Sequence, residues 1–100
     1  MKNTPVSVVL CARNEADRIE KSIRAIQACQ PDELIVVDGG STDDTVAIAE
    51  RLGARVIRSG GKGLAPDRQL GADHATCDLV AYIDADHRPT PDAINGLRRD

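Results

Sequence analysis

Asp84, Ala85 and Asp86 form the short segment of this 100-residue sequence that is best suited to metal chemistry. Two carboxylates separated by one small residue can hold a divalent cation and leave room for the phosphates of a ligand. Mg²⁺ and Mn²⁺ favour such oxygen ligands and typically bind through one or two carboxylates together with substrate phosphates. A cation held there neutralises the charge on a departing diphosphate. The motif therefore predicts a diphosphate site with Asp86 and Asp84 as its metal ligands.

Charged residues also follow the other strands that the sequence predicts. Arg13 and Glu15 follow the first strand, Asp38 follows the second, and Asp84 follows the fourth. Ligands of open α/β sheets bind beyond the carboxyl ends of the strands, near the point where the strand order reverses. The pattern therefore predicts a ligand site at one acidic edge of the domain. Solvated loop acids placed by chance would produce the same pattern, and the residues alone leave that alternative open.

Aliphatic runs alternate with helix signals along the whole chain. Short runs bounded by polar residues predict buried strands, because helix-covered parallel strands are apolar on both faces. Apolar residues at spacings of three and four, or a proline in the first turn, predict helices between them. This alternation predicts a Rossmann-like three-layer α/β sandwich with a mostly parallel sheet. The expected strands are Val6–Ala12, Leu34–Val37, Arg55–Arg58 and Asp78–Ile83, and the third expected helix is roughly Ala65–Ala75.

Capping residues suggest where the other helices begin and end. Asn14 is expected to cap the first helix. Ser41 resembles the first residue of a capping box for the second helix, which is expected to run through Leu52. Gly53 is well placed as the C-terminal cap of that helix. Thr90 followed by proline predicts the start of a last helix.

Composition excludes several classes of partner. The chain has 13 Lys and Arg residues against 16 Asp and Glu residues, a formal net charge of −3, and no basic cluster, so no nucleic-acid surface is expected. No apolar run approaches the roughly 20 residues of a membrane span. Cys11, Cys29 and Cys77 are widely spaced, so we expect reduced, buried thiols and a cytoplasmic setting. Association of a longer protein with the inner face of a membrane stays open.

Three motifs in succession resemble the family 2 glycosyltransferases, which have the GT-A fold. They are VSVVLCARNEADRI, ELIVVDGGSTDDT and GKGLAPDRQLGADHATCDLVAYIDAD, and the match runs from about Val6 to Pro91. The resemblance implies that residues 1–100 are the nucleotide-sugar-binding part of a GT-A domain, truncated after the D-x-D motif. It also implies a UDP- or GDP-sugar donor, Mg²⁺ or Mn²⁺ as cofactor, and an acceptor that the sequence does not identify.

The resemblance assigns roles to individual residues. The segment after the first strand packs against the nucleotide, with Glu15 contacting its ribose or base. Asp38 hydrogen-bonds the base, and the glycines behind it are expected to leave the acid open to a ligand. Basic residues of the following loop and helix lie near the diphosphate. The implied nucleotide-sugar-binding residues are Ala12, Arg13, Glu15, Asp38, Lys62, Arg68, Asp84 and Ala85, with Asp86 and Asp84 as metal ligands.

The sequence departs from the family pattern in residue types and in length. Cys11 stands where proline is usual, Gln69 where asparagine is common, and Arg13 where tyrosine is frequent. In the inverting members of the family, a following acceptor-binding half supplies the catalytic base. That residue is therefore expected beyond Asp100, and the segment alone is expected to be an incomplete enzyme.

Two other functions remain as alternatives at this stage. A sugar-phosphate nucleotidyltransferase also has an α/β sheet with a metal-binding acid, but its first loop typically resembles G-x-G-x-R, whereas this chain has A-R-N-E. A truncated, non-catalytic module would instead bind a partner or assemble with itself as a homo-oligomer. An exposed sheet edge would favour such assembly.

Overall fold

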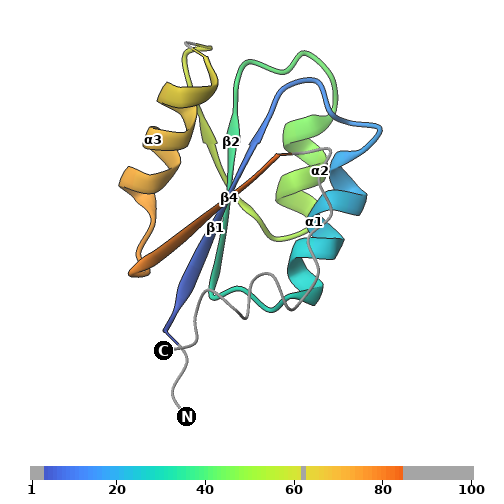
Figure 1. The fold of residues 1–100 in the computed structure, drawn as a ribbon. Coiled ribbons are helices and arrows are strands. Elements are labelled where there is room, and N and C mark those ends of the chain that lie inside the picture. The colour runs from blue at the N-terminus through green and yellow to red at the C-terminus, as the bar shows by residue number, and fades with distance from the viewer. Residues whose placement is uncertain (1–3, 62, 85–100) are drawn as a thin grey trace.

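A computed structural model describes residues 4–61 and 63–84 of the chain. These residues form a four-stranded parallel sheet with the strand order β3-β2-β1-β4. Helices α1 and α2 cover one face of the sheet and α3 covers the other (Figure 1), which confirms the three-layer α/β prediction. The elements are β1 (Val6–Ala12), α1 (Ile19–Ala28), β2 (Glu33–Asp38), α2 (Thr45–Arg51), β3 (Arg55–Arg58), α3 (Leu64–His74) and β4 (Leu79–Asp84).

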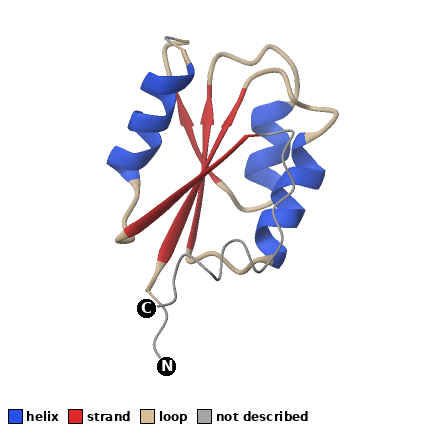
Figure 2. Cartoon of the chain, in the orientation of Figure 1, coloured by secondary structure: helices blue, strands red, loops and turns tan. Residues whose placement is uncertain are grey.

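The observed strands follow the predicted runs closely. β1 and β3 have the predicted bounds, β2 is one residue longer at each end, and β4 is displaced by one residue toward the C-terminus. Figure 2 shows the strands passing between the helical layers. The helix expected after Thr90 lies outside the described residues. Among the helices of residues 4–61 and 63–84, none has the length and apolar character needed to traverse a bilayer.

The central strand β1 supplies side chains to both halves of the core. Val8 and Leu10 pack into the larger cluster with α1 and α2, whereas Val9 belongs to the smaller cluster beneath α3. This division follows from the alternation of side chains along a strand. All three side chains are fully buried. The aliphatic run that predicted the strand therefore reflects burial on both faces of the sheet.

The predicted caps of α1 and α2 are wrong. Asn14 lies well before α1, which begins at Ile19 without any side-chain cap. α2 begins at Thr45, also without a side-chain cap, and the Ser41 hydroxyl donates to Asp38 instead. The end of α2 does follow the prediction, because Gly53 has a φ of 90° and follows the last turn.

The three cysteines form no disulfide within the described residues, and their environments differ. Cys29 is buried as expected, and burial raises the pKa of its thiol. Cys11 and Cys77 are only partly buried, so the expectation of buried thiols is wrong for these two. Cys11 is accessible because it lies at the carboxyl end of β1, where the sheet meets a pocket.

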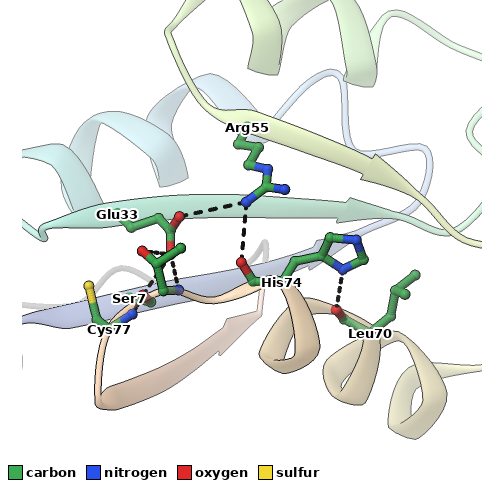
Figure 3. A network of polar contacts seen from close by, with 7 residues as sticks. Ser7, Glu33, Arg55, Leu70, His74 and Cys77 are labelled. Carbon is green, nitrogen blue, oxygen red and sulfur yellow. Dashed lines mark hydrogen bonds and ion pairs between the residues drawn. The ribbon is translucent and has the colours of Figure 1, made fainter.

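A polar network joins the strands near the amino-terminal edge of the sheet (Figure 3). Glu33 in β2 accepts hydrogen bonds from the Ser7 hydroxyl at 2.8 Å and from the Thr76 backbone N–H at 2.9 Å. The Arg55 guanidinium lies 3.8 Å from the other Glu33 oxygen. Burial opposes ionisation of Glu33, but the hydrogen bonds from Thr76 and Ser7 and the Arg55 charge outweigh it and lower its pKa. The network thus connects the strands at the amino-terminal edge of the sheet.

Candidate functional site

The carboxyl ends of three strands meet at one edge of the sheet. In the parallel register, Ala12 of β1 lies beside Asp38 of β2, and Cys11 lies beside Asp84 of β4. The chain leaves β1 toward β2 on one side and later crosses to β4 on the other side. This reversal makes the end of β1 the position at which open α/β sheets bind ligands. The structure therefore confirms that these predicted strand ends share one edge.

A pocket of about 270 Å³ lies at this edge, between the ends of β1 and β2 and the first turn of α3. It contains three of the predicted residues, from the end of β1 and the loop that follows. The ionisable side chains among its lining residues are Arg13, Glu15 and Asp67. Neither Asp38 nor Arg68 lines it. The lining residues are Cys11, Ala12, Arg13, Glu15, Gly39, Gly61, Gly63, Leu64 and Asp67.

The loop after β1 is held by side chains that precede or begin α2. Three consecutive backbone N–H groups donate to three side-chain oxygens from this second segment. The pairs are Asn14 with Ser41 at 2.8 Å, Glu15 with Thr45 at 2.9 Å, and Ala16 with Asp43 at 3.1 Å. Because the donors follow Arg13 directly, these contacts fix the backbone that carries the pocket residues.

Asp43 links this loop to the start of α2. One of its oxygens accepts from Ala16, and the other accepts from the backbone N–H of Thr45 at 3.0 Å and from the Thr45 hydroxyl. The Thr45 hydroxyl, the backbone N–H of Thr45 and that of Ala16 all lower the pKa of the Asp43 carboxyl. The S-T-D-D-T segment therefore organises the neighbouring loop.

Glu15 lies at the pocket with its side chain 20% exposed, and it is paired with Arg18. A nitrogen of the Arg18 guanidinium lies 2.6 Å from the Glu15 carboxylate. The Glu15 carbonyl also accepts the backbone N–H groups of Arg18 and Ile19, so this residue starts the first turn before α1. Its contact with a ribose or base stays a prediction.

Asp38 is engaged by its own loop, contrary to the expectation that it is open to a ligand. The residue is 2% exposed. One oxygen accepts from the backbone N–H groups of Gly40 at 3.2 Å and Ser41 at 3.1 Å, and the other accepts from the Ser41 hydroxyl. Short acidic side chains commonly stabilise turns in this way. A direct bond from Asp38 to a base stays a prediction.

The predicted basic residues and the D-x-D motif are described only in part. The Arg68 guanidinium lies over the Tyr82 ring of β4, 6.0 Å from its centroid, in a cation–π arrangement. Lys62, Ala85 and Asp86 lie outside the described residues, and Asp84 is placed only as the last residue of β4. Within the part of the chain that the structure describes, no three His, Cys, Asp or Glu residues gather as a metal site. The metal ligands therefore stay a prediction.

Sequence reasoning missed Asp67, the acid of α3 that lines the pocket. Asp67 and Gly71 are the two buried residues of α3, and they lie four positions apart on the face toward the sheet. A carboxylate on the buried face of a helix is unusual. The spacing from Gly71 was the available signal, but α3 has no regular apolar stripe that would have marked this face.

The comparisons with known proteins agree with this geometry. Residues 7–99 match the family model for glycosyl transferase family 2. An uncharacterised glycosyltransferase of Rickettsia felis is 42% identical over 81 residues, which cover 81% of this chain and 28% of that protein. An uncharacterised glycosyltransferase of Mycobacterium tuberculosis is 38% identical over 86 residues, which cover 86% of this chain and 38% of that protein. The chain thus spans about a third of the length of such relatives.

Solved structures of a glycosyltransferase have the same fold. Glucosyl-3-phosphoglycerate synthase from Mycobacterium tuberculosis, crystallised with Mn²⁺, UDP and glucosyl-3-phosphoglycerate, superposes with a TM-score of 0.75 at 37% identity. The match covers 91% of this chain and 37% of that protein. A crystal of the same enzyme with UDP alone gives a TM-score of 0.76. With a family model that matches nearly its whole length and a fold of the GT-A type, this chain belongs to glycosyl transferase family 2.

Proposed function

We propose that this chain forms the donor-binding part of an enzyme that transfers a sugar from a nucleoside-diphosphate sugar to an acceptor. The observation that carries the proposal is the pocket at the carboxyl ends of β1 and β2, beside the strand that leads into Asp84-Ala85-Asp86. Ligands of open α/β sheets bind at this position. The related synthase was crystallised with UDP and Mn²⁺, which supports the same class of donor here.

The strand order suggests how a donor lies across the edge. β1 separates β2 and β3, on whose side the pocket lies, from β4, which leads into the D-x-D motif. A nucleotide that crosses the end of β1 would place its base in the pocket and its diphosphate toward Asp84 and Asp86. The two ends of the ligand would then have different surroundings. The base would lie in a pocket lined by both charged and uncharged residues, and the diphosphate would lie beside the two carboxylates of the D-x-D motif.

The D-x-D residues fit a divalent metal by their donor chemistry. Asp84 closes β4 beside Cys11 of β1, and Asp86 follows two positions later. One or two carboxylates completed by phosphate oxygens are typical of Mg²⁺ and Mn²⁺. The bound cation would supply charge neutralisation for the leaving diphosphate. The chain's own part is to position the nucleotide through the loop that carries Arg13 and Glu15.

We further propose that the sugar is a hexose and that UDP is the first nucleotide to test. The 37% identity with a glucosyl-transferring enzyme crystallised with UDP supports this choice. The acceptor and the catalytic base would come from the portion of the relatives that this chain does not match. Membership of the glycosyltransferase family disfavours the nucleotidyltransferase alternative.

Calorimetric titration with UDP and GDP, each with and without Mn²⁺, tests the proposal. We expect metal-dependent binding of at least one nucleotide and loss of that dependence in Asp86→Ala. Asp78→Ala is the matched control, because Asp78 is an exposed acid just before β4, at the opposite edge of the sheet. If the folded protein bound neither nucleotide under any condition, the donor-binding proposal would be wrong.

A further inference from the structure

Asp67 occupies an unusual position on the helix that covers the pocket. α3 starts at the carboxyl edge of the sheet and turns Asp67 and Gly71 toward it. Gly71 packs on the strands, since a methyl group there would lie 2.4 Å from a Val9 methyl carbon. Asp67 is one helical turn earlier, where this face of α3 reaches the pocket at the strand ends. A charged side chain is therefore held where an apolar residue would be expected.

One oxygen of the Asp67 carboxylate has no hydrogen-bond partner within the described structure. The residue is only 7% exposed, and its Oδ1 atom is buried without a hydrogen-bond donor among residues 4–61 and 63–84. Its Oδ2 atom lies close to Gly39, where a methyl group would come within 3.2 Å of it. Gly39 and Asp67 both line the pocket. The absence of a side chain at position 39 therefore lets the carboxylate lie close to the Gly39 backbone at the wall of the pocket.

An ionised carboxylate only accepts hydrogen bonds, so a ligand group beside Asp67 must donate one. Like charge disfavours a phosphate group at this position. The uncharged end of a nucleotide fits instead, because the described lining residues come from β1, from α3 and from the loops after β1, β2 and β3, and none of them comes from β4, which leads into the D-x-D motif. A volume of about 270 Å³ suits one part of a ligand, such as a base.

We propose that Asp67 determines base specificity by accepting a hydrogen bond from the imino N–H of a uracil or guanine base. This inference rests on the proposed function, because it places the nucleotide of the sugar donor in the pocket. Uracil and guanine each present a ring N–H on their Watson–Crick edge, whereas cytosine and adenine present a ring nitrogen that accepts. A carboxylate therefore favours the first pair and repels the second.

The inference differs from the role that sequence resemblance gave to Asp38. Asp38 is 2% exposed and accepts three hydrogen bonds from its own loop. Asp67 lies at the same edge of the sheet, on α3, and its Oδ1 atom has no hydrogen-bond donor among the residues that the structure describes. Of the two acids, Asp67 has the larger unused acceptor capacity, which a ligand N–H requires.

Titrations of UDP, GDP and CDP in the presence of Mn²⁺ test this role in wild-type protein, Asp67→Asn and Asp67→Ala. The wild type is expected to bind UDP or GDP more tightly than CDP. Asp67→Ala should weaken the favoured nucleotide by about tenfold or more, as expected for loss of a hydrogen bond to a charged group. Asp67→Asn keeps an uncharged oxygen acceptor and should weaken the favoured nucleotide less than Asp67→Ala does. The asparagine amide can donate to the cytosine ring nitrogen and accept from the amino group, so the preference over CDP should shrink further. Asp78→Asn is the control that should keep both affinities.

Thermal unfolding without nucleotide separates a ligand role from a structural one. Removing a buried carboxylate without a partner should leave Tm unchanged or raise it. A fall of more than about 4 °C in Asp67→Asn with unchanged nucleotide selectivity would make Asp67 a structural residue and overturn the inference. Wild-type binding of UDP or GDP that neither Asp67 variant alters would overturn it while the proposed function stands. Absence of all nucleotide binding in the folded wild type would overturn both.

Discussion

The Asn14 side-chain oxygen accepts a hydrogen bond from the backbone N–H of Thr42 at 2.8 Å, and this contact ties together the loops that follow β1 and β2. The backbone N–H of Asn14 in turn donates to the Ser41 hydroxyl. Asn14 has a φ of 53°, in the left-handed region that asparagine tolerates better than most residues with a side chain. The backbone conformation of Asn14 and its side-chain acceptor therefore both stabilise the contacts of Asn14 with Ser41 and Thr42, which form a polar junction between the two loops beside the pocket.

Asn14→Ala should destabilise the fold more than Asn14→Gly. Both variants lose the contact to Thr42, which is worth about 0.5–1.5 kcal/mol. Alanine also incurs the left-handed backbone strain of about 1–2 kcal/mol, which glycine avoids. Urea denaturation measures the free energy of unfolding for both variants. Equal losses would show that the backbone at position 14 relaxes and that the φ value has no energetic consequence.

Gly71→Ala should destabilise the packing of α3 on the sheet. An added methyl group would lie 2.4 Å from one Val9 methyl carbon and 3.1 Å from a Val37 methyl carbon. Overpacking of this kind typically costs about 1–3 kcal/mol. In a double-mutant cycle read by urea denaturation, Val9→Ala should partly rescue Gly71→Ala because it removes the clash. Additive losses would indicate that α3 moves away from the sheet instead.

The strands were predictable because their signal is local and strong. The run Val6–Ala12 is aliphatic along nearly its whole length, and burial on both faces of a parallel sheet requires that composition. The parallel arrangement then follows from the alternation of strands and helices, whereas the order β3-β2-β1-β4 is known only from the structure. Strand ends with polar residues consequently meet at one edge, as the sequence predicted.

The polar junction was not predictable, because its partners are distant in sequence. Asn14 and Ser41 are both good capping residues, and each has the local pattern of a helix start. The structure pairs them across 27 positions instead, so neither caps a helix. Asp67 was missed for a related reason, since only the packing of α3 on the sheet shows that this acid faces inward. The metal ligands Asp84 and Asp86 remain predictions from the motif.

Glu33→Gln should reduce stability at neutral pH and have a smaller effect in acid. The pKa of Glu33 lies below its ordinary value, so the carboxylate stabilises the fold above the unfolded pKa of about 4.3. That contribution is lost as the pH falls through the lower folded pKa. With the side chain 17% exposed, we expect a loss of about 1–3 kcal/mol at pH 7.

Urea denaturation of wild type and Glu33→Gln at several pH values between 7 and 3 checks this prediction. The exposed Glu50 on α2 gives the control Glu50→Gln, which should change little at any pH. A loss of stability in Glu33→Gln that stays constant down to pH 3 would show that the amide disturbs the packing around Ser7 rather than removing a charge effect.

Asp38→Asn separates the loop role of Asp38 from the predicted contact with a base. The carboxylate accepts three hydrogen bonds within its own turn, and an amide nitrogen in place of either oxygen would face one or more of these donors. The variant should therefore lose about 1–3 kcal/mol of stability without any nucleotide present. Ser41→Ala removes one of these donors and should cost less, although it also breaks the contact to Asn14. Thermal or urea unfolding of the free protein measures both losses. If Asp38→Asn kept full stability and lost only nucleotide affinity, Asp38 would be the base-binding acid that the family resemblance implies.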